Sequence, residues 1–280
     1  MAQAMFSLFV GTREEVAARM IDLANLKKGD VVVDLGAGDG RLVIGSAKSN
    51  PGVTGFGVDL NPKLVQEARA RAWVEGVDKQ VTFLQKNVFD ADLSKVDVIY
   101  MWLFPELQRL LRPKILAEAR PGTRIVTQMF DMGAWQADAV DKEQASVRMW
   151  IVPANIAGYW TWDLKLPGTK KNTYVAIIEQ AFQNADAAVR VDNTRRATRE
   201  FKINGDEVKF TLNMPLPGME ASQEHEFIGK VKGNVIEGRV RMHNPVRGDS
   251  EKFDVTEYPW RAVRSPTTTY FKPTGLEPVR

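Results

Sequence analysis

Residues 31–41 read Val-Val-Val-Asp-Leu-Gly-Ala-Gly-Asp-Gly-Arg, and this stretch decides the fold. Three β-branched residues in a row predict a short buried strand, which a glycine-rich turn follows at once. Residues 42–48 then have the pattern of the first turns of a helix. A strand, a glycine turn and a helix in this order bring free backbone N–H groups and a helix N-terminus to one point. Such a point is suited to the close approach of a nucleoside-like ligand.

The spacing of the glycines distinguishes this turn from the dinucleotide fingerprint G-x-G-x-x-G. Here Gly36, Gly38 and Gly40 alternate with single residues, and Asp34 stands just before them. The next apolar strand pattern ends in Asp59, a second carboxylate about 20 residues further along the chain. A carboxylate at that strand tip can accept hydrogen bonds from both ribose hydroxyls. The alternative is a tight turn in an unrelated α/β protein, but strand, turn, helix, strand and acid at this spacing favour a ligand site.

The pattern D-x-G-x-G-x-G resembles motif I of class I S-adenosylmethionine (SAM) methyltransferases. More broadly, the first 165 residues are similar to a bacterial group of these enzymes, related to the mitochondrial lysine methyltransferases that modify the ATP synthase c-subunit. Beyond the glycine turn, the resemblance rests on segments 12–16, 57–62, 103–105, 111–114, 121–126 and 132–135. It implies SAM as the cofactor and a lysine side chain as the methyl acceptor.

The same resemblance implies which residues bind the cofactor. They are Asp34, Gly36, Ala37, Gly38, Gly40, Asp59, Leu60, Asn87 and Val88. Asn87 replaces the more usual aspartate at the edge that holds the adenine, and its amide can still form hydrogen bonds there; a plain turn is the alternative. In many class I methyltransferases the leading segment folds over the cofactor, which makes Phe9 and Thr12 candidates, although its helix could equally only cover the sheet edge.

The acceptor side is expected at the fourth strand, because ligands in open α/β sheets bind outside the carboxyl ends of the strands. There Trp102, Phe104 and Pro105 could form an apolar wall that excludes water and orients a nucleophile; aromatic core packing is the alternative. The chain departs from the related group in having Arg13 after Thr12, where proline is usual. It also has Thr127-Gln128 where Ser-His is common. No side chain is expected to act as a general base, since Asp131 reads as a solvated loop carboxylate.

Alternating strand and helix patterns up to about residue 130 predict a doubly wound, mostly parallel sheet. Thr12 and Glu15 fit a capping box for a first helix that ends near Gly29. Asn61-Pro62 reads as another helix start, and a further helix is expected to break before Pro113. Segments 147–153 and 158–164 read as an antiparallel hairpin that closes the sheet edge.

Residues 166–280 have a different sequence pattern from the preceding part of the chain. Residues typical of turns occur at 204–206, 217–218, 233–234 and 247–249. Short alternating segments lie between the turns, which predicts a small antiparallel sandwich or barrel. The segment resembles lipocalin-like β modules of some bacterial proteins and ends in Trp260-Arg261-Ala262-Val263-Arg264. This resemblance implies no catalysis. Such a module serves more often as a structural or interaction surface than as a container for an apolar ligand.

Composition narrows the function classes. The 280 residues are 44% hydrophobic and 26% charged, with a net charge of +3, and they lack the basic bias of a nucleic-acid-binding protein. The basic cluster at 190–199 reads as a solvated face. The chain has no cysteine and two histidines, so we expect neither disulfides nor a metal site. No apolar run has the length of a membrane span. Ala2-Gln3-Ala4 resembles the end of a secretory signal without its apolar region, whereas a SAM enzyme is expected in the cytoplasm.

The sequence therefore predicts a SAM-dependent methyltransferase that acts on a protein lysine. A small-molecule N- or O-methyltransferase is the second enzymatic hypothesis, and RNA methylation is a minor one. A third class is an inactive SAM-fold protein that works through the β module.

Overall fold

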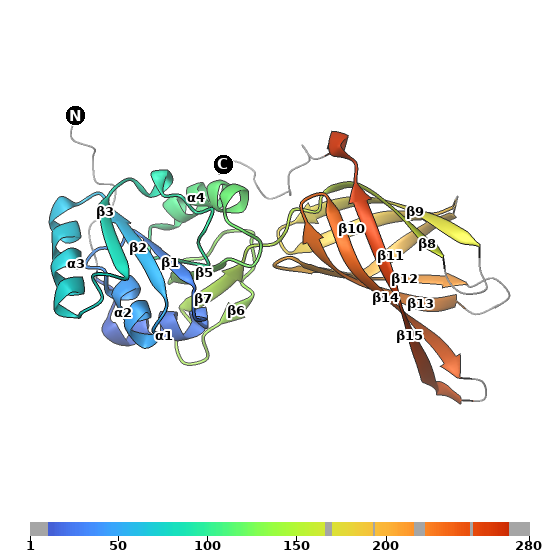
Figure 1. The fold of residues 1–280 in the computed structure, drawn as a ribbon, viewed down its shortest axis with the longest axis horizontal. Helices are drawn as coiled ribbons and strands as arrows, with labels where there is room; N and C mark the ends of the chain where they lie inside the picture. Colours follow the sequence, from blue (N-terminus) through green and yellow to red (C-terminus); the bar gives the residue numbers. More distant parts are fainter. Residues whose placement is uncertain (1–10, 166–169, 193, 216–221, 247–248, 269–280) are drawn as a thin grey trace. The chain divides into compact units, whose positions relative to one another are not determined.

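A computed structural model describes residues 11–165, 170–192, 194–215, 222–246 and 249–268 of the chain (Figure 1). The chain forms two compact units that divide between Val152 and Pro153, rather than after residue 165. The first unit contains the glycine turn, and the second contains the antiparallel strands. None of the helices in the described ranges is long and apolar enough to cross a membrane.

The first unit is built on a sheet with the strand order β3-β2-β1-β4-β5-β7-β6. Its strands are β1 (Val31–Leu35), β2 (Thr54–Asp59), β3 (Val81–Gln85), β4 (Val98–Met101), β5 (Arg124–Gln128), β6 (Ala139–Val140) and β7 (Val147–Ile151). The five strands β1–β5 run parallel, and β7 joins the sheet antiparallel to β5. The order reverses between β1 and β4, so the predicted doubly wound sheet is confirmed, with its switch point beside the glycine turn.

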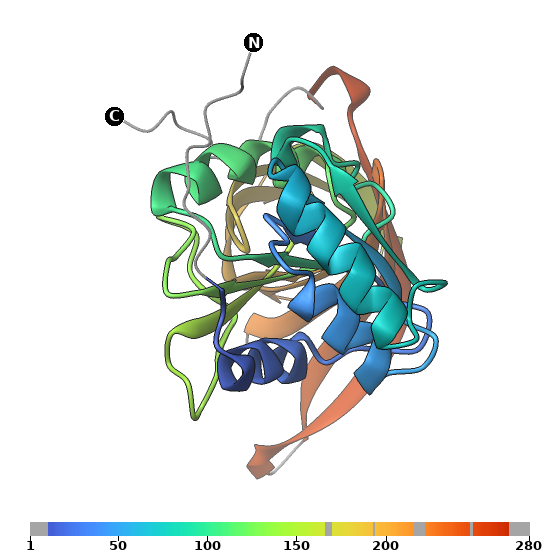
Figure 2. The same ribbon diagram turned by 90° about the vertical axis from the view of Figure 1, so that its left-hand side faces the viewer.

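In the described part of this unit, one α-helix precedes the strands, and three α-helices and one 3₁₀ helix lie between them. They are α1 (Glu14–Ala24), α2 (Arg41–Ser49), α3 (Pro62–Val74), η1 (Val88–Asp90) and α4 (Pro105–Glu118). Figure 2 shows α1 and α2, in blue, lying next to each other. Their apolar faces bury Val16, Met20, Val43 and Ile44 in one cluster with Val32 of β1. The burial of these faces holds the helix that follows the glycine turn in place.

Three local predictions in this unit are wrong. Arg13, not Thr12, is the N-cap of α1, and no side chain caps it; Thr12 is instead 6% exposed, with its carbonyl bonded to another side chain. The helix ends at Ala24, because Asn25 takes the left-handed conformation (φ 48°) before Gly29 is reached. Helix α4 continues through Pro113, since residues on both sides of the proline are buried in the unit and outweigh one missing hydrogen bond.

The start of α3 is as predicted. Asn61 is its N-cap, and the side-chain oxygen accepts the Lys63 N–H at 3.0 Å. Pro62 occupies the first helical position, where no backbone N–H is needed. The helix ends at Val74, two residues before Gly76, which has a φ of +70°.

The predicted edge hairpin of 147–153 and 158–164 does not form. Strand β7 belongs to the first sheet, whereas β8 (Gly158–Lys165) pairs along its length with β9 (Lys171–Ala181). The alternation of apolar and polar residues in 158–164 is compatible with either sheet. The packing of the folded protein therefore decided the partner of this strand. Trp160, Trp162 and Leu164 of β8 are all buried among the side chains of the second unit.

The second unit is a closed barrel with the strand order β10-β11-β12-β13-β14-β15-β8-β9. Its remaining strands are β10 (Asn184–Val191), β11 (Thr194–Asn204), β12 (Glu207–Pro215), β13 (Ser222–Lys232), β14 (Val235–Val246) and β15 (Asp249–Arg264), followed by a 3₁₀ turn, η2 (Pro266–Thr268). The predicted turns at 204–206 and 233–234 are present, and those at 217–218 and 247–248 lie outside the described residues. Aromatic side chains fill the interior, including Trp162, Tyr174, Phe210, Phe227 and Trp260.

Candidate active site

The glycine turn has the backbone that its sequence requires. Gly36, Gly38 and Gly40 have φ angles of 91°, 54° and 79°, a region that side chains other than glycine rarely adopt. The N–H groups of Gly36 and Ala37 both donate to the Val58 carbonyl at 2.9 Å. These bonds attach the start of the turn to β2, so the two strand ends form one rigid rim.

Close packing gives a second reason for two of these glycines. A Cβ at Gly36 would lie 2.8 Å from Leu103 Cδ2, and a Cβ at Gly40 would lie 2.6 Å from Phe83 Cζ. In the same layer, a Cβ at Gly57 would lie 2.5 Å from the Ala37 Cβ. The turn therefore packs tightly on its inner side.

Asp59 lies at the tip of β2, where the second predicted carboxylate was expected. Its Oδ2 accepts the Gly38 N–H at 2.9 Å, and its Oδ1 accepts the Asn61 N–H at 2.8 Å. Each carboxylate oxygen has a further lone pair for a hydroxyl donor. The next residue, Leu60, is half-buried, and its carbonyl accepts from Gln85 Nε2 at 3.4 Å. The structure thus brings the glycine turn, Asp59 and Leu60 together.

Asp34 is 4% exposed near the end of β1. It pairs in register with Tyr100 of β4, so both side chains lie on the same face of the sheet. Burial raises the pKa of Asp34 to about 8, and the nearby carboxylates of Asp59 and Asp39 contribute to the rise. A carboxyl with this pKa is mostly protonated at neutral pH and ionises when a cation binds beside it.

An arginine cluster joins the leading segment to the glycine turn. Arg41 donates to both oxygens of Asp39, at 2.8 Å from Nε and 2.6 Å from Nη2, and its Nη1 donates to the Thr12 carbonyl. Arg71 of α3 donates to the same Asp39 carboxylate at 2.9 Å. Thr12 is therefore held against the turn, as the cofactor-covering hypothesis requires, while Phe9 lies outside the described residues.

The adenine-side candidates follow β3. Asn87 is half-buried and caps η1, because its side-chain oxygen accepts the Phe89 N–H at 3.1 Å. This hydrogen bond is the one expected if Asn87 only forms a turn, which was the alternative to a role in adenine binding. It uses one lone pair of the amide oxygen. Val88 is the first residue of η1 and is half-buried. Both residues follow the carboxyl end of β3, which pairs with β2 up to Asp59 and Gln85.

The acceptor-side candidates lie where β4 ends and α4 begins. Trp102 is half-buried, Phe104 is 45% exposed, and Pro105 is the first residue of α4. Phe104 is therefore not the core residue that the alternative proposed. On the neighbouring strand, Met101 pairs with Thr127, and the buried Gln128 follows it. An exposed aromatic ring at the carboxyl edge is suited to contact with a bound molecule.

Sequence reasoning missed Asp39, Arg71 and Tyr100. The ion pair between Asp39 and Arg41 could have been predicted, since an acidic and a basic residue two positions apart on a turn can form a salt bridge. The second ion pair, between Asp39 and Arg71, could not, because Arg71 is distant in sequence. Tyr100 looked like part of a buried strand, yet its hydroxyl lies 3.1 Å from Ser46 Oγ. Tyr100 lies on the same face of the sheet as Asp34. Burial raises the pKa of the Tyr100 hydroxyl above its usual range.

The doubly wound sheet, the glycine turn and the carboxylate at the tip of β2 together define a SAM-dependent methyltransferase. Residues 34–139 match the family model of the ANTKMT methyltransferase domain. A protein-lysine N-methyltransferase of Saccharolobus islandicus is 35% identical over 134 residues, which are 48% of this chain and 83% of that protein. The chain belongs to this family of protein-lysine N-methyltransferases.

Two further relatives extend the comparison. The adenine nucleotide translocase lysine N-methyltransferase of Mus musculus is 31% identical over 150 residues. The matched region is 54% of this chain and 64% of that enzyme. A crystal structure described as an RNA methyltransferase of Salinibacter ruber with S-adenosyl-L-homocysteine is 40% identical. The match covers 52% of this chain and 96% of the Salinibacter ruber chain, with a TM-score of 0.50. Each of these matches thus corresponds to about half of the present chain.

Proposed function

We propose that this protein transfers the methyl group of SAM to the ε-amine of a lysine in a protein substrate. The observation that carries the proposal is the 35% identity to the archaeal protein-lysine N-methyltransferase over 83% of its length. Within the matched region this chain has a complete cofactor-type turn and an exposed aromatic ring at the acceptor edge.

The residues at the carboxyl ends of β1 and β2 fit SAM. The glycines allow the positive φ angles of the turn, and Asp59 has lone pairs for the ribose hydroxyls. Asp34 is a buried carboxyl that a positively charged ligand would ionise. Asn87 and Val88 are assigned to the adenine edge. When bound, SAM supplies an electrophilic methyl group, so the protein mainly has to orient the acceptor and keep the site dry.

A lysine acceptor must lose its proton before it can attack. Burial of an amine disfavours its charged form and lowers its pKa. Trp102 and Phe104 would provide that apolar environment on the acceptor side. Asp131 is exposed, and its Oδ1 accepts the Gly133 N–H at 3.0 Å. This carboxylate therefore serves a turn, and we assign it no role as a base.

RNA is a second candidate acceptor, because the Salinibacter ruber relative is described as an RNA methyltransferase. Charge argues against it: residues 1–150 contain 19 basic and 19 acidic side chains, whereas RNA-binding domains carry a basic surface.

Incubation of the full chain with methyl-labelled SAM and a cell extract separates the acceptors. We expect label that proteinase removes and nuclease leaves, and mass spectrometry should locate it on lysine. The Asp59→Ala variant is the control for background labelling. Label that only nuclease removes would establish RNA as the acceptor, and label confined to the small-molecule fraction would exclude both polymers.

A further inference from the structure

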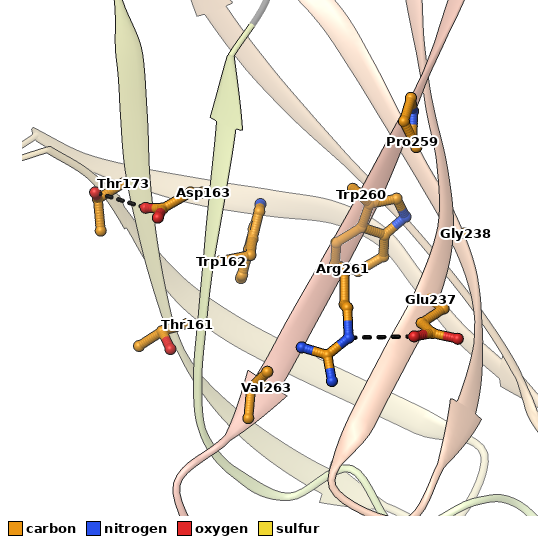
Figure 3. Close-up of a pocket in the computed structure, with 10 residues that line it drawn as sticks. All are labelled: Thr161, Trp162, Asp163, Thr173, Glu237, Gly238, Pro259, Trp260, Arg261 and Val263. Carbon is orange, nitrogen blue, oxygen red and sulfur yellow. Dashed lines mark hydrogen bonds and ion pairs between the residues drawn. The ribbon is translucent and has the colours of Figure 1, made fainter.

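The barrel is closed unevenly between β8 and β15. Only two residue pairs join these strands, Val263 with Thr161 and Arg264 with Trp160. Beyond these pairs a cavity of about 950 Å³ opens between the two strands. Figure 3 shows Thr161, Trp162 and Asp163 on one side of this cavity and Pro259, Trp260 and Arg261 on the other.

The backbone of β15 faces the cavity at alternate residues. The Arg264 N–H donates to the Asn234 carbonyl at 2.9 Å, on the side of β14, while the Ser265 N–H donates to the Tyr159 carbonyl at 2.8 Å, on the side of β8. Because backbone groups alternate along a strand, Arg261 shares the direction of Ser265. Its N–H and C=O therefore point toward β8, across the cavity.

A proline lies beyond the last residue pair of the two strands, on the edge of β15 that faces β8. Extension of their register would place Asp163 opposite Arg261 and Lys165 opposite Pro259. Proline has no N–H to donate, so the ladder cannot continue at Pro259. The facing side chains are held apart by other partners, since Arg261 Nε donates to Glu237 at 3.1 Å and Thr173 donates to Asp163 at 2.8 Å.

The floor of the cavity is aromatic. Trp162 and Trp260 are each 4% exposed, and their rings meet edge to face with centroids 5.5 Å apart. The indole Nε1–H of Trp260 donates to the Ile228 carbonyl at 3.0 Å, which fixes the orientation of that ring. The gap is therefore a groove in the barrel wall above a filled interior.

We propose that this groove binds an extended peptide segment of a partner protein, which adds as a strand between β8 and β15. Among the described residues, no residue pair joins β8 and β15 beyond Thr161 and Val263, and the edges of the two strands face each other there. A peptide backbone can pair with both edges, as in other cases of strand addition. A purely apolar ligand would leave those N–H and C=O groups unpaired. The proposal concerns the barrel alone and does not depend on the identity of the methyl acceptor.

The lining also predicts what the peptide should look like. Its side chains alternate between the barrel interior and the outer face. The inward residue above Trp162 and Trp260 has little room and should be small, such as glycine, alanine or serine. The adjacent residues point outward beside Asp163, Glu237 and Arg261 and should be polar. A peptide with alternating small and polar residues fits this groove.

The first test is selection of a displayed heptapeptide library on the full chain, followed by N-methylation of each amide of one enriched peptide in turn. We expect each paired position to lose roughly tenfold or more in affinity, because successive main-chain amides of an inserted strand donate alternately to β8 and to β15. Loss at alternate positions only would place the peptide on a single strand edge and would contradict insertion between the two strands. Failure to enrich any peptide, or equal tolerance of N-methyl groups along the peptide, would overturn the proposal.

The second test closes the groove. The chain has no cysteine, so the double variant Asp163→Cys with Arg261→Cys introduces the only two thiols. A reducible thiol-specific cross-linker with a spacer of about 10 Å, which corresponds to two strand spacings, should bridge the groove. It should lower affinity for the enriched peptide roughly tenfold or more, and reductive release of the cross-link should restore it. Equal binding in both forms contradicts the proposal. Mass spectrometry of the cross-linked sample checks that the bridge lies within one chain.

Discussion

The carboxylate of Asp59 bonds to the backbone of Gly38, with 2.9 Å between Oδ2 and the amide nitrogen. Its other oxygen bonds to the Asn61 N–H at 2.8 Å. One side chain at the end of β2 therefore connects the turn after β1 to the start of α3. Because the same carboxylate is the expected partner of the ribose, the shape of the turn and the binding of the cofactor depend on one residue.

The Asp59→Ala variant should bind SAM at least roughly tenfold more weakly, since it loses charge-assisted hydrogen bonds both to the turn and to the ribose. Isothermal titration calorimetry measures this change. The matched control is Asp78→Asn, an exposed carboxylate at the opposite edge of the sheet, which should bind normally. Unchanged binding by Asp59→Ala would remove this carboxylate from the site.

The Gly40→Ala variant should destabilise the first unit by about 1–3 kcal/mol beyond a purely conformational penalty, because its Cβ meets Phe83 at 2.6 Å. Gly76→Ala isolates that penalty: Gly76 has a similar positive φ of 70° but open space around its Cβ position. Scanning calorimetry of both variants gives the difference, with the first unit identified as the transition that SAM shifts. Equal losses in the two variants would show that the packing at Phe83 relaxes freely.

SAM binding should release a proton near pH 7. Asp34, with its pKa raised to about 8, is mostly protonated in the free protein, and a bound cation favours its ionised form. Affinity should therefore rise as the pH increases from about 6 to 8, because the proton no longer competes. Calorimetry in two buffers of different ionisation enthalpy counts the released protons. In Asp34→Asn this release should disappear; its persistence would assign the proton to another group.

The Phe104→Ala variant should lower kcat/KM for the methyl acceptor roughly tenfold while leaving the SAM affinity unchanged, because we propose that the ring contacts the acceptor and not the cofactor. Leu110→Ala is the matched control: Leu110 is 58% exposed on the same helix, α4, and should have normal activity. Steady-state methylation assays compare the two. A loss of SAM affinity in Phe104→Ala would move this ring to the cofactor.

The local sequence pattern correctly predicted much of the secondary structure of the first unit. The glycine turn was recognised from the spacing of its glycines after Asp34, and their positive φ angles explain why glycine stands there. Asn61-Pro62 was recognised because that pair satisfies the start of a helix. The errors lie where distant contacts compete with a local preference. Thr12 does not cap α1, since its carbonyl is bonded by Arg41, and α4 passes through Pro113 because its flanking residues are buried.

The order of strands, turns and acids in the sequence was enough to determine the doubly wound, mostly parallel sheet and the cofactor class. Each of these follows from spacing along a short stretch of chain. Only the tertiary structure decided the partner of β8, the Arg41 link to the leading segment and the open groove beside Pro259. These features depend on which distant segments meet, and an alternating strand pattern is compatible with more than one neighbour.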